Sequence, residues 1–433
     1  MIVLKRNALD ELIKWKNEVD REPLILNGAR QVGKTWLMKE FAKKHFDSFV
    51  YFNFDEQDDI KEIFAVNKSA ERIIERLSLI SGIAIEPQKT LIIFDEIQEC
   101  SDALNSLKYF NESNKKYFVI SAGSLLGTLL SQPKSYPVGQ VNIIKIEPLS
   151  FDEFLRATDE KLYEFYIKIK KDSFIEKIFH NRLVEVYQNY LIIGGLPECV
   201  QSWIKYKDPK KVHQIQGEII KLYENDFSKH SGKVNSARIL MVFRNIVTQL
   251  AKENKKFIYS KIQKGARARE FEEAIEWLIS AGIINRVYLS SKNGYPLKTY
   301  DDLNAFKLYL FDTGLLKYMA GIENESIVLN KDFPFKGVLA ENFVLQQIKN
   351  NFIVEPRYFT FDRYEIDYLI QIKDRIIPVE VKAGDAVNSK SIKAYEIKFS
   401  PEICVRYSLL NYKKDGKIKN IPLYLANKTE ELI

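Results

Sequence analysis

The chain has 433 residues and a formal net charge of +7, and it is 46% apolar, 12% aromatic and 28% charged. This composition is globular, which excludes disordered, collagen-like and low-complexity proteins, and the length predicts two to four domains. Three widely separated cysteines without a CxxC pair argue against a disulfide scaffold or a zinc ribbon. The cysteine pattern predicts a reducing, cytoplasmic setting, and because no long apolar run is present the sequence predicts no membrane segment.

The first part of the chain alternates predicted strands and helices. Short apolar runs at residues 23–28, 48–54, 90–96 and 117–124 alternate with helix-forming segments such as residues 35–46. Continuous apolar runs of this length are typical of strands that are buried on both faces. Residues 1–150 are therefore predicted to form an α/β domain with a parallel sheet.

The pattern changes to helices over residues 151–232. Residues 233–331 then read as helix, short helix, helix and a β-ribbon around Asn293-Gly294, with strands at RVYL and LKTY. That order resembles a winged helix whose recognition helix is residues 266–281. Residues 332–433 are predicted to be a C-terminal α/β domain, with a helix at 337–351 and strands at 357–361, 365–372 and 376–383.

The charge is unevenly distributed. Residues 1–150 carry a net charge of −1, residues 151–330 carry +5 and residues 331–433 carry +3. The densest basic stretch, residues 252–269, has seven basic residues and one acidic residue. Such a stretch either contacts the phosphates of a nucleic acid or is a solvated surface, and the sequence leaves both interpretations open.

Residues 28–35, GARQVGKT, fit the phosphate-loop pattern GxxxxGK[ST]. The loop follows a predicted strand and opens a predicted helix, which is the context that the pattern requires. Lys34 is expected to reach the β- and γ-phosphates of ATP, and the Thr35 hydroxyl is expected to bind Mg²⁺. The residues predicted to bind ATP are Gly28, Ala29, Arg30, Gln31, Val32, Gly33, Lys34, Thr35 and Trp36.

A later apolar strand, residues 90–96, ends in two acids. Asp95 is expected to lie near the Mg²⁺ bound by Thr35, and Glu96 is expected to orient or deprotonate a water, so the pair predicts hydrolysis rather than nucleotide binding alone. Ser121 and Ser124 end the next predicted strand. Ser124 is predicted to contact the γ-phosphate or the attacking water, and the alternative is a serine that only forms a turn.

Six segments in order, GARQVGKT, LIIFDEIQE, VISAGSLLG, EPLSFDEFL, YLIIGGLPECV and YENDFSKH, resemble the prokaryotic AAA-type (AAA+) ATPases related to the archaeal ATPase group. The resemblance covers essentially the whole chain. It implies an AAA+ fold, ATP and Mg²⁺, a helical lid over 151–232, a winged helix and a C-terminal domain of unknown function, and it is compatible with a homo-oligomer. Many relatives carry Gly-Arg where this chain has Gly139-Gln140, so an arginine finger is either absent or comes from elsewhere.

The C-terminal region contains the order Glu…Asp…Glu-x-Lys. Glu341 lies on a predicted helix, Asp367 on a strand, and Glu380 and Lys382 on the next strand of a hairpin. The three carboxylates are predicted to hold Mg²⁺, and Lys382 to steer a water or neutralise the transition state. The arrangement resembles the restriction-endonuclease-like PD-(D/E)xK nuclease fold, especially its Holliday-junction-resolvase-like branch. Two alternatives remain open: a plain hairpin with a surface Glu/Lys pair, and a nuclease fold that does not cleave.

The sequence thus predicts a Mg-ATPase with a nuclease-like C-terminal domain that binds or cleaves DNA. The predicted recognition helix carries four glutamates, which disfavours its entry into a groove of DNA. The alternative function is a regulatory ATP switch that binds protein partners and has a catalytically silent nuclease-like domain.

Overall fold

The structure is a computed structural model, and it describes residues 4–66, 69–113, 117–123, 139–230, 234–352, 354–385 and 389–433. The chain forms two compact units. One comprises Val3–Glu147 with Glu276–Ile283, and the other contains Pro148–Ile275 and Ile284–Ile433. Among the residues described, none of the helices has both the length and the apolar character needed to cross a bilayer.

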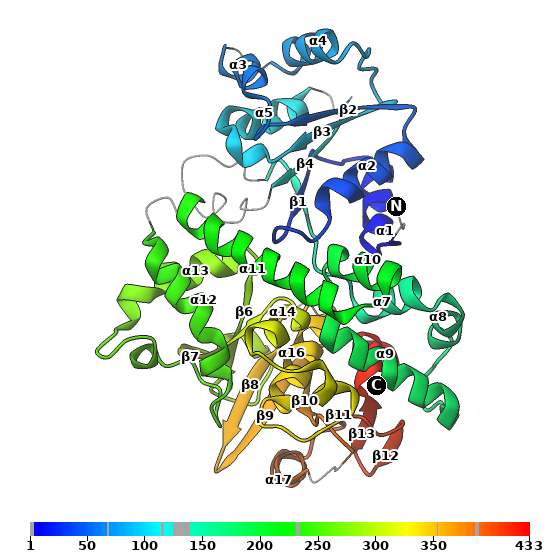
Figure 1. Cartoon of the computed structure of the whole chain (residues 1–433), viewed down its shortest axis with the longest axis vertical. Helices are drawn as coiled ribbons and strands as arrows, with labels where there is room; N and C mark the ends of the chain where they lie inside the picture. Colours follow the sequence, from blue (N-terminus) through cyan, green and yellow to red (C-terminus); the bar gives the residue numbers. More distant parts are fainter. Residues whose placement is uncertain are drawn as a thin grey trace. The chain divides into compact units, whose positions relative to one another are not determined.

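The first unit is built on a five-stranded sheet with the order β2-β3-β4-β1-β5, in which every neighbouring pair is parallel (Figure 1). Its strands are β1 (Leu24–Asn27), β2 (Ser48–Asn53), β3 (Thr90–Asp95), β4 (Phe118–Gly123) and β5 (Asn142–Lys145). Every residue of β3 and β4 is buried, as expected for apolar strands covered on both faces. Because the strands are parallel and only β4 lies between β1 and β3, the carboxyl ends of β1 and β3 lie near each other at the same edge of the sheet.

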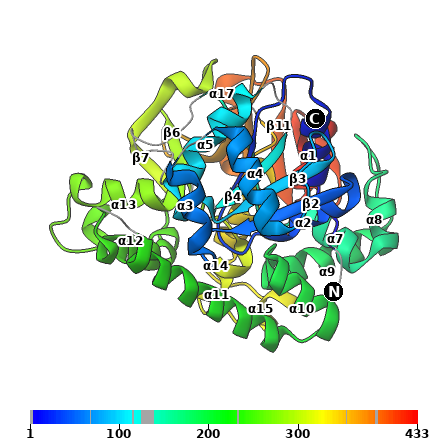
Figure 2. The same ribbon diagram turned by 90° about the horizontal axis from the view of Figure 1, so that it is seen from above.

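Helices cover both faces of this sheet (Figures 1 and 2). They are α1 (Ala8–Asn17) and α2 (Lys34–His45) on one face, and α3 (Asp58–Val66), α4 (Ala70–Ser81) and α5 (Ser101–Glu112) on the other, with the 3-10 turn η1 (Ile97–Glu99) after β3. Successive residues of β4 point to opposite layers. The ring of Phe118 packs against Trp15 of α1 with centroids 5.9 Å apart, whereas Val119 belongs to the core formed with α3, α4 and α5.

Five helices begin the second unit: α7 (Phe151–Thr158), α8 (Glu160–Tyr166), α9 (Lys177–Ile193), α10 (Pro197–Tyr206) and α11 (Pro209–His230). They were expected to form a separate lid, but they share a core with α16 (Lys336–Ile348). The Phe151 amide donates to Gln347 Oε1 at 2.7 Å, and the ring of Tyr190 lies 5.4 Å from that of Phe343. The helical segment and the C-terminal region are therefore one compact unit.

The second unit contains an eight-stranded sheet with the order β12-β13-β11-β10-β9-β8-β6-β7. Its strands are β6 (Ile284–Ser290), β7 (Asp301–Leu310), β8 (Arg357–Phe361), β9 (Tyr364–Ile372), β10 (Arg375–Val381), β11 (Cys404–Ser408), β12 (Lys413–Asp415) and β13 (Ile418–Pro422). The other helices and 3-10 turns are α12 (Ser236–Leu250), η2 (Tyr259–Lys261), α13 (Ala268–Ser280), η3 (Leu297–Tyr300), α14 (Thr313–Met319), α15 (Asn324–Val328), α17 (Lys390–Phe399), η4 (Leu423–Lys428) and α18 (Thr429–Leu432). The end of α13, from Glu276, belongs to the first unit.

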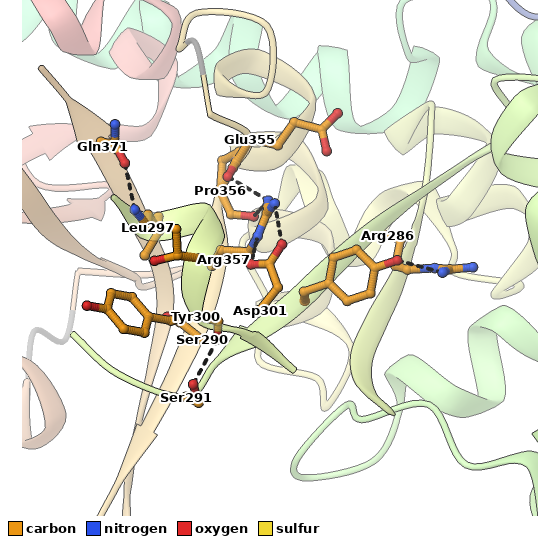
Figure 3. Close-up of polar contacts among 12 residues, drawn as sticks. Arg286, Ser290, Ser291, Leu297, Tyr300, Asp301, Glu355, Pro356, Arg357 and Gln371 are labelled. Atoms are coloured by element: carbon orange, nitrogen blue, oxygen red, sulfur yellow. Dashed lines mark hydrogen bonds and ion pairs between the residues drawn. The ribbon is translucent and has the colours of Figure 1, made fainter. Parts of the chain in front are cut away.

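The ribbon of β6 and β7 is continuous with the C-terminal strands. Strand β6 pairs antiparallel with β7 and also pairs in parallel with β8. Arg357 of β8 forms a two-pronged ion pair with Asp301 of β7, with Nε–Oδ1 at 2.5 Å and Nη2–Oδ2 at 2.9 Å (Figure 3). A self-contained winged helix over residues 233–331 is therefore not confirmed, because its ribbon forms one side of the larger sheet.

The second strand of the ribbon also differs from the prediction. Residues 297–300, LKTY, form the turn η3, and the strand begins only at Asp301. The Leu297 amide donates to Gln371 Oε1 of β9 at 2.8 Å, which holds this turn against the neighbouring hairpin. A side-chain contact between segments so far apart in the chain leaves no local pattern in the sequence.

Candidate functional site

The predicted phosphate loop connects β1 to α2. A Cβ atom at Gly28 would lie only 2.2 Å from the backbone oxygen of Ile146, so this position accepts no side chain. Gln31 and Gly33 have left-handed backbone conformations, with φ of 65° and 92°. Ala29 and Val32 are buried, and Arg30, Thr35 and Trp36 are half-buried. The loop is thus held close to β5 in the conformation that its glycines permit.

Lys34 is buried at the start of α2. Its ammonium group donates to the backbone oxygens of Gly28 and Ala29 at 2.8 and 2.9 Å. Burial lowers the pKa of Lys34 to about 8, and the negative charges of Glu96 and Asp95 only partly oppose this effect. The loop therefore surrounds a buried cation, and a bound anion would stabilise its charged form.

Thr35 and Asp95 meet at the edge of the sheet, as the sequence predicted. The Thr35 hydroxyl donates to Asp95 Oδ2 at 2.7 Å, and the Tyr51 hydroxyl donates to the same oxygen at 2.9 Å. Burial raises the pKa of Asp95, although both hydrogen bonds act in the opposite direction. A hydroxyl beside a carboxylate supplies the oxygen ligands that Mg²⁺ prefers, so these residues fit a magnesium ion.

Glu96 follows Asp95 directly and has a left-handed backbone, with φ of 48°. Gln98 Nε2 donates to Glu96 Oε2 at 2.5 Å. A non-glycine residue in this region is strained, and such strain often occurs at functional sites. The two acids of the strand end are therefore placed at the phosphate-loop edge, with Glu96 held by a neighbouring amide.

The serine predictions concern β4. Ser124 lies outside the described residues. Ser121 is fully buried between β1 and β3, where its partners in the sheet are Ile25 and Phe94. Within the described parts of the chain, its hydroxyl oxygen has no hydrogen-bond partner.

Arg6 supports the phosphate loop and was not found from the sequence. Its guanidinium donates to the backbone oxygen of Val32 at 2.9 Å and to that of Glu147 at 2.6 Å. Tyr51 is a second residue that was missed, although it contacts Asp95. Neither belongs to a local pattern, so only the folded chain reveals them.

The C-terminal carboxylates define what we call the acidic centre: Glu341 of α16, Asp367 of β9 and Glu380 of β10. The hairpin pairs Val379 with Tyr368, so that Glu380 and Asp367 are neighbours at the next position, on one face of the sheet. Asp367 Oδ2 accepts from the amide of Val381 at 2.7 Å. Glu341 and Glu380 are both buried.

Two lysines contact this centre. Lys382 lies beside Glu380, with Nζ and Oε1 2.8 Å apart. Lys255 forms an ion pair with Glu341 Oε1 and was not predicted to lie here. It belongs to the basic stretch 252–269, whose lysines were expected to face solvent or phosphate. A buried ion pair formed across the fold overrides that expectation.

Electrostatics connect the carboxylates. Burial alone would raise the pKa of Glu341, but the ammonium groups of Lys255 and Lys307 lower it below its ordinary value. Burial raises the pKa of Asp367, and the charge of Glu341 raises it further. Asp367 and Glu341 are therefore close enough for each to sense the charge of the other.

The predicted three-carboxylate metal site is not assembled. No group of three or more His, Cys, Asp or Glu side chains is placed to hold a metal ion in the part of the chain that the structure describes. Glu341 Oε2 accepts from the Tyr309 hydroxyl at 3.0 Å while Oε1 contacts Lys255, so both oxygens of Glu341 are engaged.

The second half of the basic stretch is largely exposed, whereas Lys252 and Lys256 are half-buried. The segment from the end of η2 to the first turn of α13 presents four basic side chains to solvent: Lys261, Lys264, Arg267 and Arg269. Helix α13 itself exposes Glu273 and Glu276. Residues 261–269 therefore offer positive charge to an anionic partner, whereas α13 beyond its first turn exposes negative charge at Glu273 and Glu276.

Comparison with known proteins identifies the N-terminal part. A family model described as an AAA domain matches residues 20–155. Models described as domains of unknown function match residues 184–326 and 336–426. The comparison with curated proteins gave no match.

Three solved structures show distant similarity. The Walker-type ATPase PABY2304 of Pyrococcus abyssi is 15% identical, with 73% of this chain and 96% of that chain covered and a TM-score of 0.48. The Orc1 protein of Aeropyrum pernix in complex with DNA is 13% identical, with 74% and 94% covered and a TM-score of 0.30. PCH-2 of C. elegans is 12% identical, with 47% and 67% covered and a TM-score of 0.24.

The family match covers the strand before the phosphate loop, the loop itself, and the strand that ends in Asp95 and Glu96. It agrees with the parallel sheet and with the contact between Thr35 and Asp95. Over residues 20–155 the chain is therefore similar to AAA domains, with a phosphate loop between the first strand and the helix that follows it.

Proposed function

We propose that the protein hydrolyses ATP with Mg²⁺ at the phosphate loop, and that the reaction uses Lys34, Thr35, Asp95 and Glu96. The carrying observation is the contact of Thr35 with Asp95 at the edge where the loop holds a buried Lys34. When bound, Mg²⁺ neutralises phosphate charge. Lys34 binds the phosphate oxygens, Thr35 and Asp95 hold the ion, and Glu96 orients a water and takes up its proton.

Substitution of Glu96 by Gln tests this assignment, because the amide keeps the size of the side chain but removes its basicity. Glu96→Gln should bind ATP with near-normal affinity and hydrolyse it at least about 100-fold more slowly. Binding is measured with a fluorescent nucleotide, and turnover by phosphate release. Glu99→Gln, on the adjacent turn η1, is the matched control and should retain turnover. Normal turnover in Glu96→Gln would show that another group handles the water.

We further propose that the second unit binds or cleaves DNA through the acidic centre. The hairpin that brings Asp367 next to Glu380, the contact of Lys382 with Glu380, and the exposed basic segment of residues 261–269 support this function. Asp367 and Glu380 are the residues that would hold a divalent ion, which would stabilise charge on a scissile phosphate. Lys382 would orient the attacking water or neutralise the phosphate.

DNA cleavage is tested with branched and duplex DNA in Mg²⁺ or Mn²⁺. Asp367→Asn and Lys382→Ala should remove cleavage while ATP hydrolysis continues, and Lys398→Ala, an exposed lysine on α17, should cleave as the wild type does. Cleavage that survives in Asp367→Asn would place the reaction elsewhere.

One observation favours a second candidate function, a regulatory ATP switch with a silent nuclease-like domain. Both oxygens of Glu341 are engaged by Lys255 and Tyr309, which leaves no free oxygen there for a metal ion. The exposed glutamates of α13 would then face a protein partner rather than DNA. Wild-type protein that neither binds nor cuts DNA with any divalent ion would favour this function.

A further inference from the structure

The ammonium group of Lys255 is the positive charge paired with Glu341 in the acidic centre. Its side chain is 16% exposed and that of Glu341 is 5% exposed, so the ion pair is largely removed from water. The other oxygen of Glu341 accepts from Tyr309 of β7. Removal of either partner of such an ion pair would leave the other charge buried and unpaired, which is strongly unfavourable.

The backbone conformation of Lys255 also depends on the ion pair with Glu341. Lys255 has a left-handed conformation, with φ of 51°, which is unfavourable for a residue with a long side chain. The chain on its C-terminal side is fixed, because the Phe257 amide donates to the Phe306 oxygen at 2.9 Å and the Ile258 amide donates to Gln249 Oε1 at 3.1 Å. The strained residue therefore lies at the end of an anchored segment, and its ion pair with Glu341 favours the strained conformation.

The acidic centre retains unused capacity for a cation. Glu380 is 3% exposed, and its Oε2 atom has no hydrogen-bond partner within the described part of the chain, although Oε1 contacts Lys382. The carboxylates Glu341, Asp367 and Glu380 can together carry three negative charges, and Lys255 and Lys382 bring two positive ones. The nearby charge of Lys307 is balanced by its ion pair with Glu365. Without Lys255, the remaining excess of two negative charges equals the charge of one divalent ion.

We propose that Lys255 and a divalent cation exclude each other at the acidic centre, so that Lys255 keeps the centre closed to metal until its segment withdraws. This inference rests on the proposed metal-binding role of the acidic centre. When Lys255 withdraws, Glu341 Oε1 becomes free. This oxygen, the carboxylate of Asp367 and Glu380 Oε2 are then available as the oxygen ligands that Mg²⁺ and Mn²⁺ prefer. In the present arrangement the Lys255 ammonium, rather than a metal ion, is paired with Glu341.

The test is Mn²⁺ binding to the full-length, nucleotide-free protein, measured by calorimetry and by electron paramagnetic resonance. Lys255→Met keeps the apolar length of the side chain and removes its charge. It should bind one Mn²⁺ at least tenfold more tightly than the wild type. Lys256→Met, a change at the neighbouring residue, should bind as the wild type does. The double variant Lys255→Met with Asp367→Asn should lose the added site.

The outcomes separate this inference from the function on which it rests. Equal, Asp367-dependent binding in the wild type and in Lys255→Met would overturn the role of Lys255 and leave the metal site standing. No Asp367-dependent binding in either protein would overturn both.

If Lys255→Met fails to fold, the proposal can still be tested by a measurement on the wild-type protein. Lysine acetylation, read by mass spectrometry, should label Lys255 faster as Mn²⁺ is added, while the labelling of Lys256 stays constant. Labelling of Lys255 that does not respond to saturating Mn²⁺ would overturn the proposal.

Discussion

Lys34 is expected to reduce the stability of the nucleotide-free protein, and Lys34→Met should reveal this. The pKa of Lys34 falls from 10.5 to about 8 on folding, so at about pH 7 the buried ammonium costs about 3 kcal/mol relative to a neutral side chain. Its two hydrogen bonds, to the oxygens of Gly28 and Ala29, each stabilise the folded protein by about 1 kcal/mol and so partly offset this cost. Lys34→Met should therefore be about 1 kcal/mol more stable than the wild type, while it loses ATP binding.

The pH dependence identifies the cause. Because the folded pKa of Lys34 lies below the unfolded one, the stability from its neutral form is present at high pH and is lost as the pH falls through about 8. Between about pH 7 and about pH 9.5 the wild type should gain about 2 kcal/mol relative to Lys34→Met. Urea unfolding followed by tryptophan fluorescence measures this difference. The reasoning fails if the difference does not change with pH, or if Lys34→Met is less stable by about 3 kcal/mol at pH 7.

Two further predictions concern backbone contact and sheet continuity. Gly28→Ala should weaken ATP binding at least tenfold in a nucleotide titration. The added Cβ would lie 2.2 Å from the backbone oxygen of Ile146, which cannot easily move because the Ile146 amide donates to the Asn27 oxygen at 2.7 Å. Unchanged affinity would contradict this prediction. Arg357→Met should lower the free energy of unfolding, measured by urea denaturation, by about 3 kcal/mol, because the Asp301 carboxylate, whose side chain is only 11% exposed, would lose its partner. Adding Asp301→Asn should restore part of this loss. A loss below about 1 kcal/mol would mean that the pair contributes no more than a surface ion pair.

The ATPase part was the most predictable from the sequence. Strands β3 and β4 are buried on both faces, so each leaves a continuous apolar run, whereas the short edge strand β5 was not predicted. The phosphate loop has fixed residue types because its backbone conformation requires them. The hairpin of β9 and β10 was also predictable, since an alternating strand on either side of Lys373-Asp374 is a local signal.

Long-range contacts were not predictable in the same way. The parallel pairing of β6 with β8 joins residues that are far apart in the chain and appears in no periodicity. Arg6 and Lys255 look like ordinary surface cations in the sequence, and only the fold brings them to Val32 and Glu341. The chain was therefore divided into four predicted domains, whereas the structure has two compact units.

The position of β6 has a consequence for the synthesis of the protein. Strand β6 has β7 on one side and β8 on the other, and β8 is made only after α14, α15 and α16. Until β8 emerges from the ribosome, β6 presents an unpaired edge of backbone donors and acceptors, which is a surface that other chains can join. A chain cut between residues 331 and 357 would keep that edge permanently open. The β6–β7 ribbon therefore completes its pairing only when the C-terminal strand β8 has been made.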